Sequence, residues 1–261
     1  MLRHLTILVV LLAPLPAIAE QAASCTALFV GGQAPRLLNA RLADRTHPLC
    51  YRAFAVLASG MTRGALWSAE HLTAATVTNA RTTPRVDVFQ PDDNLRAADR
   101  AELDDYARSG FDRGHMTPSG DMPDGDAQAE SFSLANMVPQ TPELNRGLWA
   151  RIESAVRGLA RRRGEVYVVT GPAFQGSNLQ QVNGRVLVPS STWKAVYVPR
   201  TREVGAYSCT NIARPSCQIL SVATLAGQVG IDPFPGVPDG TKAVVARLPL
   251  PRPPRQRSTT P

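Results

Sequence analysis

The sequence PELNRGLWARIESAVRGLARRR, residues 142–163, carries the clearest helical pattern of the chain. Apolar side chains recur three and four positions apart along it, at Leu144, Leu148, Ile152, Val156 and Leu159. This spacing predicts a helix with one apolar face, which needs a core to pack against. Gly164 follows the last arginine and is typical of a helix end. We therefore expect one long helix over residues 142–163.

Strands are predicted before and after this helix. Runs of β-branched and aromatic residues between turn residues lie at Arg52–Leu57, Glu165–Gly171, Arg185–Val188, Thr192–Val198 and Glu203–Cys209. Further helical patterns lie at Ala98–Ala107 and between Ser221, a typical N-cap, and Gly230. Strands and helices intermingle without regular alternation. We therefore expect an α+β fold with a mixed, largely antiparallel central sheet flanked by helices.

Composition narrows the class of protein. The chain has 261 residues, of which 28 are basic and 21 acidic, for a formal net charge of +7. With 44% hydrophobic residues it is not a disordered chain, and four cysteines are too few for a scaffold held by disulfides alone. Lys194 and Lys242 are the only lysines, so the basic charge is nearly all arginine, whose fork of donors suits phosphate. Composition therefore permits a nucleic-acid partner without identifying one.

The first residues have the parts of a secretory signal. Arg3 precedes an apolar run, Leu5–Ala19, that ends in small residues. The run is too short to span a membrane, and its two prolines argue against a buried N-terminal helix. We expect a signal peptide at 1–19, one domain at 20–248 and a disordered Pro/Arg-rich tail at 249–261. The protein is then expected to be secreted or periplasmic, with no membrane span.

The cysteines are expected to form disulfides in such an oxidising compartment. Cys25, Cys50, Cys209 and Cys217 allow three connectivities. We favour Cys25–Cys50 together with Cys209–Cys217, because this pairing closes the shortest loops. One alternative is a lipoprotein cleavage site before Cys25, which would acylate that residue, but the even number of cysteines argues against it. A zinc site is not expected, because no two cysteines have close ligand spacing.

A histidine in a turn is the first candidate for chemistry. The stretch SGFDRGHMTP, residues 109–118, places His115 close behind Asp112 and Arg113 and next to a glycine. Histidine is the side chain best suited to take up a proton near neutral pH. The neighbouring arginine offers a fixed cation for a phosphate. The pattern favours acid–base chemistry at a phosphate.

Asn145 and Glu153 lie eight positions apart in the predicted long helix. Eight residues are a little over two turns, so the two side chains lie roughly 80° apart around the axis and on the same broad side. An amide oxygen with a carboxylate behind it suits Mg2+, which takes few protein ligands and keeps most of its waters. Taken alone, Asn145 is equally well interpreted as a helix N-cap, and Trp149 as a core residue.

Several stretches of the chain match one known pattern. They are DRGH at 112–115, ANMVPQ at 135–140 and LNRGLWARIE at 144–153, with looser matches in ALWSAE at 65–70 and TLAGQVGIDPFP at 224–235. On these motifs the chain resembles the DNA/RNA non-specific endonuclease family, over about residues 50–240. That family comprises extracellular nucleases with a ββα-metal, or His-Me finger, active site, and its relatives include mitochondrial endonuclease G.

Carried over position by position, the resemblance implies a catalytic site. His115 corresponds to the family's general base, and Asn145 to its only direct protein ligand for the metal, Mg2+ or alternatively Mn2+. Glu153 corresponds to the acid that orients a water on this metal. Arg113 matches the motif arginine, and Arg85 matches more loosely a second arginine that faces the phosphate. Supporting hydrogen bonds are implied for Asp112, Asn136 and Gln140.

The resemblance also implies a reaction. It implies hydrolysis of phosphodiester bonds in DNA and RNA, with 5′-phosphorylated products and low sequence specificity. Homodimers are common among the relatives, so a homodimer is one expected state. Two alternatives are a nuclease restricted to one nucleic acid and an exported protein that binds nucleic acids without cleaving them. The joint presence of His115, Asn145 and Glu153 favours an enzyme, because a site that has lost its activity usually loses one such residue.

Overall fold

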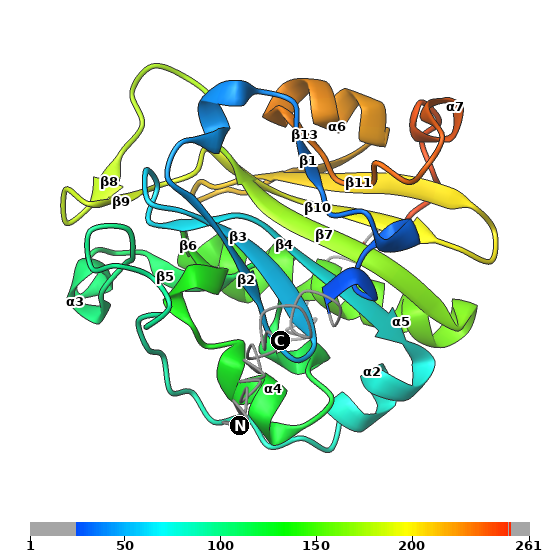
Figure 1. Ribbon diagram of the computed structural model, residues 1–261, viewed down its shortest axis with the longest axis horizontal. Helices are drawn as coiled ribbons and strands as arrows, with labels where there is room; N and C mark the ends of the chain where they lie inside the picture. The colour runs from blue at the N-terminus through cyan, green and yellow to red at the C-terminus, as the bar shows by residue number, and fades with distance from the viewer. Residues whose placement is uncertain (1–24, 250, 252–261) are drawn as a thin grey trace, which may run out of the picture.

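The computed structural model describes residues 25–249 and residue 251. A seven-stranded antiparallel sheet runs through them (Figure 1). In spatial order its strands are β12 (Cys217–Leu220), β11 (Glu203–Thr210), β10 (Ser191–Val198), β7 (Glu165–Ala173), β4 (Gly64–Thr73), β3 (Phe54–Ser59) and β2 (Thr46–Cys50). This sheet confirms the predicted α+β class. The predicted signal peptide and most of the predicted tail lie outside the described residues.

Helices lie against both faces of the sheet (Figure 1). One face carries α6 (Val222–Val229), α7 (Asp239–Lys242) and the short strands β1 (Arg36–Leu37) and β13 (Ile231–Asp232). The other carries α2 (Ala74–Ala80), α4 (Gly125–Glu130) and α5 (Ala150–Arg163). The shorter elements are η1 (Val30–Gly32), η2 (Ala40–Ala43), α3 (Leu103–Tyr106), β5 (Asp112–His115), η3 (Ser119–Asp121), η4 (Leu134–Asn136), β6 (Met137–Gln140), η5 (Leu144–Trp149), β8 (Gln181–Val182) and β9 (Val186–Leu187).

Each face of the sheet has its own apolar core, and we name the faces after the helices that cover them. On the α6 face, Trp67 and Trp193 are buried together with Leu225 of α6. On the α5 face, Trp149 and Val156 are buried in a second cluster. Trp149 has no exposed surface, which confirms its interpretation as a core residue. The sheet is therefore covered on both sides.

The short helix α6 begins and ends where the sequence predicts. The Ser221 Oγ accepts a hydrogen bond from the backbone N–H of Thr224 at 3.1 Å, which satisfies one free donor of the first turn. Gly230 follows the helix with a φ of 70°, a left-handed conformation that favours glycine. Local side chains were sufficient to set both ends of this helix.

The long predicted helix is confirmed, but its first part is a π-helix. This part is η5, and α5 continues from it without a break in the chain. Asn145 therefore lies inside a helix, and its interpretation as an N-cap is wrong. Its backbone N–H already donates to the carbonyl oxygen of Thr141 at 2.9 Å, so the helical bonding has begun before it.

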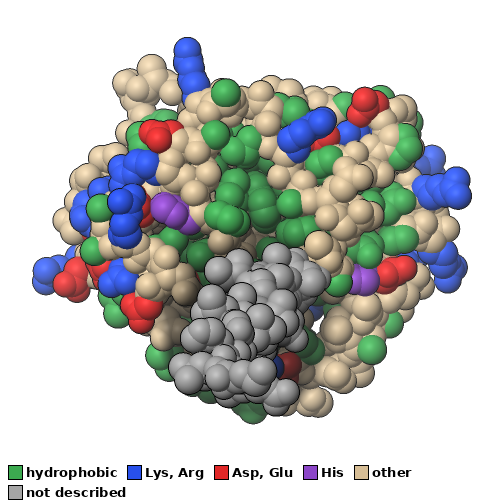
Figure 2. Space-filling model, in the orientation of Figure 1, with side chains coloured by type: hydrophobic (Ala, Val, Ile, Leu, Met, Phe, Trp, Pro, Cys, Tyr) green, Lys and Arg blue, Asp and Glu red, His purple; other side chains and the backbone are tan. Residues whose placement is uncertain are grey.

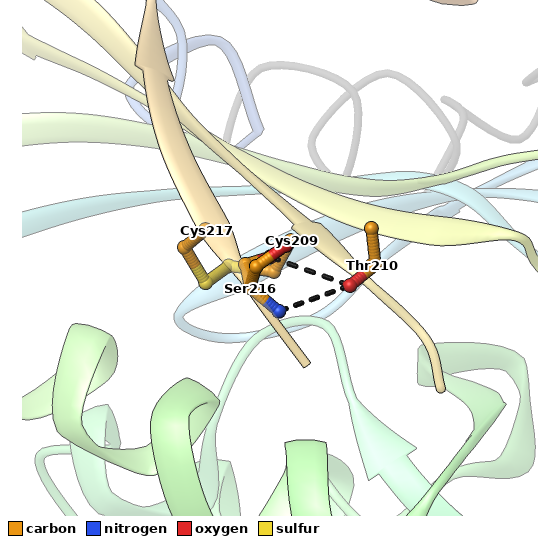
Figure 3. The surroundings of a disulfide bond; sticks show 4 residues. All are labelled: Cys209, Thr210, Ser216 and Cys217. Carbon is orange, nitrogen blue, oxygen red and sulfur yellow. Dashed lines mark hydrogen bonds between the residues drawn. A yellow bond between two sulfur atoms is a disulfide. The ribbon is translucent and has the colours of Figure 1, made fainter. Parts of the chain in front are cut away.

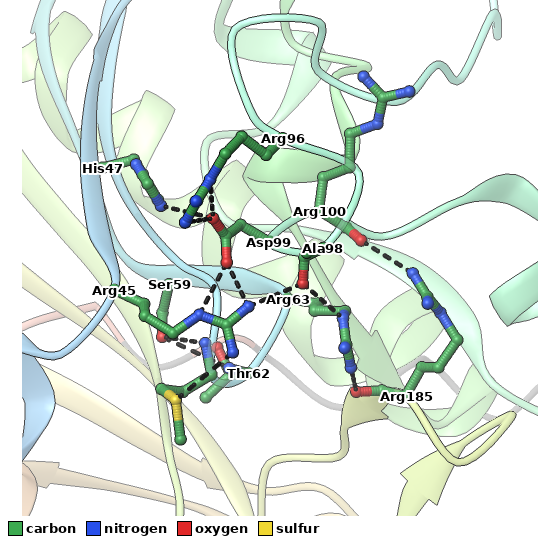
Figure 4. A network of polar contacts seen from close by, with 11 residues as sticks. Arg45, His47, Ser59, Thr62, Arg63, Arg96, Ala98, Asp99, Arg100 and Arg185 are labelled. Carbon is green, nitrogen blue, oxygen red and sulfur yellow. Dashed lines mark hydrogen bonds and ion pairs between the residues drawn. The ribbon is translucent and has the colours of Figure 1, made fainter.

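The predicted helix at Ala98–Ala107 is wrong over most of its length, because only α3 is helical there. Asp99 is buried, and its carboxylate accepts hydrogen bonds from the guanidinium groups of Arg45 and Arg96, while His47 lies 3.3 Å away (Figure 4). Arg96 is three residues away, but Arg45 and His47 come from a distant part of the chain. These contacts hold the residues around Asp99 in turns, and such tertiary contacts override local helix preference.

Four of the predicted strands are confirmed, with small shifts at their ends. They are β3, β7, β10 and β11, whose ends differ by at most two residues from the predicted ranges. The strand predicted at Arg185–Val188 shortens to β9, since Asn183 and Gly184 form a tight turn with positive φ just before it. The strands β2, β4 and β12 of the sheet were not predicted.

Both predicted disulfides are present. Cys25–Cys50 joins the first described residue to the edge strand β2, with 5.9 Å between the Cα atoms. Cys209–Cys217 links β11 to the opposite edge strand β12, where the two residues are direct neighbours across the ladder (Figure 3). Beside it, the backbone N–H of Ser216 donates to the Thr210 Oγ1 at 3.0 Å. The two edge strands of the sheet are each tied by one covalent bond.

The visible surface is mixed. On the face shown in Figure 2, Lys and Arg side chains gather toward the left and right edges, and apolar side chains lie at the centre. Within the part of the chain that the structure describes, no helix is long and apolar enough to cross a membrane.

Candidate active site

Two short strands and the helix after them frame the candidate site. β5 pairs with β6, which places His115 opposite Met137 and Asp112 opposite Gln140. The chain then enters η5 and α5. The order of elements is strand, strand, helix, which is the ββα arrangement that the resemblance implies.

Two of the predicted supporting residues fix the backbone beside His115. The supporting hydrogen bond predicted for Gln140 is not found, because neither its Oε1 nor its Nε2 has a partner among the described residues. Gln140 instead packs against Gly114, where a Cβ atom would lie 2.3 Å from the Gln140 Oε1, so only glycine fits. The Asn136 Oδ1 accepts a hydrogen bond from the backbone N–H of Thr117 at 3.0 Å, and its Nδ2 donates to the Thr117 carbonyl at 2.8 Å. Both amides are fully buried and hold this backbone from behind the site.

A cavity of about 870 Å³ opens between β5 and the start of the long helix. Six residues predicted from the sequence line it: Arg85, Asp112, Arg113, His115, Asn145 and Glu153. They come from the segment after α2, from β5, from η5 and from α5. The fold therefore brings together residues that are up to 68 positions apart, from Arg85 to Glu153.

His115 is held in an apolar pocket at the inner end of this cavity. Its side chain is 8% exposed, and the rings of Phe89 and Phe132 lie 5.8 and 5.0 Å from the imidazole. Among the described residues its Nε2 has no hydrogen-bond partner. Burial, helped by the positive charge of Arg85, lowers the pKa of His115 to about 3. The imidazole is therefore neutral near pH 7.

Asp112 orients the side chain of Asn145. The Asn145 Nδ2 donates to the Asp112 Oδ2 at 2.9 Å, and Arg146 makes two further hydrogen bonds to the same carboxylate, at 2.8 and 2.6 Å. Burial opposes the charged form of Asp112, but the bonds from Arg146 and Asn145 hold its pKa below the ordinary value. With its nitrogen engaged by this carboxylate, the Asn145 amide has its Oδ1 left as an acceptor.

The donor set around Asn145 fits a hard cation with few protein ligands. Among the described residues no group of three His, Cys, Asp or Glu side chains could hold a metal ion by itself. A single oriented amide oxygen at the wall of an open, polar cavity is instead the kind of site at which Mg2+ keeps most of its waters. Asn145 is therefore the residue that could hold a divalent cation here.

Glu153 reaches the cavity from the first turn of α5. Burial raises the pKa of its carboxyl to about 7, although the positive charges of Lys194 and Arg157 act in the opposite direction. A carboxyl with such a pKa exchanges a proton near neutral pH. Its position on the same side of the helix as Asn145 agrees with the predicted spacing.

Four more charged residues, which the sequence analysis missed, interact electrostatically with Glu153, and one of them, Arg157, also lines the cavity. We call Glu70, Asp121, Arg157 and Lys194 the buried charge cluster. The Lys194 Nζ donates to the Thr170 Oγ1 at 2.6 Å and to the carbonyl oxygen of Met116, the residue after His115, at 3.4 Å. Burial raises the pKa of Glu70 well above its ordinary value. A lysine inside the predicted strand Thr192–Val198 was the one available signal.

The guanidinium groups at the cavity differ in how they are held. Arg85 pairs with Asp87 at 2.5 Å and donates to the Ser119 Oγ at 2.9 Å. Arg113 lies over the ring of Phe89, 4.2 Å from its centroid. These contacts fix both arginines next to His115, where they can face a phosphoryl group.

Sequence comparison places the chain among nucleases. The family model of the DNA/RNA non-specific endonucleases matches residues 39–240. A nuclease from Nostoc sp. is 40% identical over 134 residues, which cover 51% of this chain and 47% of the relative. Nuclease C1 from Cunninghamella echinulata is 38% identical over 160 residues, covering 56% and 62%. The mitochondrial endonuclease G of Homo sapiens is 40% identical over 114 residues, covering 43% and 38%. The chain thus spans less than two thirds of each of these relatives.

Comparison with solved structures gives the same fold. The crystal structure of an EndoG/EndoGI complex contains a chain that matches with a TM-score of 0.66 at 24% sequence identity. The match covers 72% of this chain and 86% of that one. At this identity the likeness concerns the fold alone.

Proposed function

We propose that this chain, which belongs to the DNA/RNA non-specific endonuclease family, is a metal-dependent nuclease that hydrolyses phosphodiester bonds of DNA and RNA. One observation carries the proposal: a neutral buried imidazole, an oriented amide oxygen and several guanidinium groups line one cavity. Phosphodiester hydrolysis needs a base, a site for a cation and neutralisation of the phosphoryl charge. The cavity offers a group for each of these roles.

His115 is the proposed general base. Its Nε2 has no partner among the described residues, and its low pKa leaves it free to accept a proton from an attacking water. A bound phosphate brings negative charge close to the imidazole, which favours the protonated form. The imidazole therefore becomes a stronger base when the substrate is in place, and the proton stays on His115 until the product leaves.

Arg113 and Arg85 are the proposed contacts to the phosphoryl oxygens. Both line the cavity beside His115, and a guanidinium group can donate two hydrogen bonds to one phosphate. Phosphates are the same in every sequence, so contacts to them select no base. We therefore propose low sequence specificity and an affinity that falls as salt rises.

The Asn145 Oδ1 is the proposed ligand for Mg2+, with Mn2+ as an alternative, and Asp112 keeps the amide turned toward it. When bound, the cation supplies Lewis-acid stabilisation of the negative charge that develops on the phosphodiester. Glu153 lines the same cavity, where its carboxylate is the proposed acceptor of hydrogen bonds from a water on the cation. Attack of water in line with the 3′ oxygen breaks the P–O3′ bond and leaves the phosphate on the 5′ end, and the departing 3′ oxygen takes its proton from water in the cavity. We therefore propose 5′-phosphorylated products.

We further propose that residues 20–248 form the functional domain and that the protein is secreted or periplasmic. Its two disulfides support an oxidising compartment, because such bonds are rare in reducing ones. The human relative bears a mitochondrial name, so the compartment requires its own test. Recovery of the protein with both disulfides in the culture medium or periplasmic fraction is the expected result, and retention in the cytoplasm with free thiols would contradict it.

The activity is tested with two polymers and one chelator. Purified protein is incubated with plasmid DNA and, separately, with ribosomal RNA, first in EDTA and then after Mg2+ or Mn2+ is restored. We expect both polymers to be cleaved only with metal, and the fragment ends to accept a label at the 5′ position only after phosphatase treatment. Cleavage in EDTA would contradict the metal requirement, and cleavage of one polymer would restrict the substrate. Intact polymers in Mg2+ would contradict nuclease activity.

The metal site is tested by Asn145→Ala, with Asn79→Ala on the exposed surface of α2 as the matched control. Removal of the amide oxygen should move the Mg2+ concentration for half-maximal cleavage sharply upward, whereas the control should leave it unchanged. Calorimetric Mg2+ titration without substrate gives a readout that does not depend on activity. An unaltered titration of Asn145→Ala would exclude this ligand.

A further inference from the structure

One arginine at the cavity has no partner, and this sets it apart. Of the guanidinium groups that line the cavity, those of Arg85, Arg146 and Arg157 each pair with a carboxylate, and Arg113 lies over Phe89. Arg108 is exposed and makes no side-chain hydrogen bond, ion pair or ring contact with any residue in the described part of the chain. It is therefore a cation at the cavity wall whose charge no neighbour neutralises.

The backbone that carries Arg108 is both strained and firmly held. Arg108 has a φ of 55°, in the left-handed region that glycine adopts without cost and arginine rarely adopts. The turn is fixed by the Ser109 Oγ, which donates to the carbonyl of Tyr106 at 2.9 Å. The preceding helix α3 is anchored by Asp105, which pairs with Arg185 at 2.8 Å. The side chain thus starts from a rigid base.

Arg108 lies before β5, at the end of this strand away from His115 and the reacting phosphate. The scissile group must reach His115 at the far end of β5, whereas Arg108 precedes the start of this strand. Four extended residues, Asp112–His115, place the two ends of β5 roughly 10 Å apart. Arg108 lines the same cavity from beyond the other end of β5, so its cation is suited to a neighbouring phosphate of the same nucleic-acid strand.

We propose that Arg108 forms a phosphate subsite, in which its guanidinium group binds a nucleic-acid phosphate that flanks the one being cleaved. The inference rests on the proposed nuclease function. The turn before β5 positions this cation at the cavity wall. Because the contact is to phosphate, DNA and RNA are bound there without selection of a base.

The chain provides a matched control in Arg202. It also has a φ of 55°, is exposed, and makes no side-chain hydrogen bond, ion pair or ring contact within the described residues, but it lies in the turn between β10 and β11, at a different groove. Arg108→Gly and Arg202→Gly therefore each remove one positive charge and relieve the strain of a left-handed backbone at the substituted residue. Both substitutions should raise the melting temperature. Arg108→Ala removes the charge but keeps the strained φ, so it separates the two effects.

The test is binding of a short DNA duplex, measured by fluorescence anisotropy in EDTA over a series of salt concentrations. We expect Arg108→Gly and Arg108→Ala to weaken binding roughly tenfold and to lower the slope of log affinity against log salt by about 1. Arg202→Gly should remain within twofold of the unaltered chain. Equal losses at both positions, or no loss at Arg108, would overturn the subsite.

The same variants are assayed for cleavage in Mg2+, which separates the two proposals. A higher KM at an unchanged kcat for Arg108→Gly supports the subsite, because the side chain contacts no reacting atom. If the unaltered chain cleaves and Arg108→Gly matches it in both binding and KM, the subsite is wrong and the nuclease function stands. If the unaltered chain binds the duplex but never cleaves it, the nuclease function is wrong, and the salt series alone decides the subsite.

Discussion

The two faces of the central sheet are both buried, yet they are filled in opposite ways. On the α6 face, strand β10 contributes Trp193, which packs among apolar residues such as Trp67. One position later on the same strand, Lys194 is equally buried on the α5 face, beside Thr170. Glu70 lies on this face too, with no hydrogen-bond partner for its carboxylate among the described residues.

This difference assigns the two faces different tasks. Buried charges without direct partners cost free energy, whereas buried apolar side chains contribute it. The α6 face is filled by apolar side chains, whereas the α5 face combines an apolar core with the buried charge cluster, in which Glu70 has no direct partner among the described residues. Buried charged or polar groups that gather in one place are typical of a functional site. The predictions below follow from this contrast.

The largest effect is expected on the α5 side, at His115. Removal of the general base in His115→Ala should reduce the cleavage rate by about 10²–10⁴-fold, while the melting temperature and DNA binding persist. The control is His71→Ala, because His71 stacks on Tyr167 with ring centroids 4.1 Å apart and does not line the cavity. Cleavage rates on plasmid DNA measure both. Near-normal activity of His115→Ala would remove this residue from the base role.

On the α6 face the largest effect should be on stability. Trp193 is fully buried, and its Nε1 donates to the carbonyl of Pro172 at 2.9 Å. Trp193→Ala should lower the free energy of unfolding by about 3–5 kcal/mol, because it leaves a cavity and an unpaired carbonyl. Urea unfolding measures the loss, and the rate per folded molecule, taken at low temperature, should change little. A large fall in that rate would show that the two faces are not separate.

The two disulfides allow the two faces to be compared through smaller effects on stability. Cys25 belongs to the α6-face core and Cys209 to the α5-face core. Their sequence separations are 25 and 8 residues. Loop-closure entropy predicts that replacing the first pair with alanines costs about 3.5 kcal/mol and replacing the second about 2.5 kcal/mol. Thermal unfolding of the two double variants gives the order. A larger loss from the Cys209–Cys217 pair would contradict the entropic account.

The smallest effect concerns pH and Glu153. Its pKa is raised to about 7 in the folded protein, so the folded state binds this proton more tightly than the unfolded state does. The stability that it contributes is complete below pH 4.5 and is lost as pH rises through 7. Glu153→Gln should therefore unfold like the unaltered chain at pH 4 but be more stable at pH 8, by about 1–3 kcal/mol, although cleavage falls.

This measurement is made in EDTA, so that no cation alters the balance. Glu143→Gln, at an exposed position of the same helical segment, is the control. A stability difference between Glu153→Gln and the unaltered chain that does not grow with pH would contradict the raised pKa of this carboxyl.

Part of the fold was predictable because local side chains decide it. The ends of α6 follow from Ser221 and Gly230, and the apolar stripe of the long helix needs only the periodicity of residues 142–163. Strand β4 was missed, because both of its faces are buried and its sequence therefore shows no alternation of apolar and polar residues. The turn around Asp99 depends on Arg45, 54 positions away, so no local pattern could reveal it.

The candidate site was predictable as a set of residues but not as a structure. Motifs named His115, Asn145 and Glu153, and the fold brings all three to one cavity. The hydrogen bond from Asn145 to Asp112 joins residues 33 positions apart and depends on how η5 packs beside β5. The buried charge cluster draws its members from strands β4 and β10 and from η3 and α5, so their proximity follows only from the assembled fold.

The π-helix that carries Asn145 has a consequence for how this chain can change. A π turn takes in one residue more than an α turn. If one residue were deleted within Leu144–Trp149, the segment could relax to an α-helix, and Asn145 would swing by roughly 100° about the axis relative to Glu153. Neighbouring residues can compensate for a substitution in this segment, whereas the deletion of one residue would turn the Asn145 amide in another direction. Sequence length at this turn is therefore as strongly constrained as the identity of the asparagine.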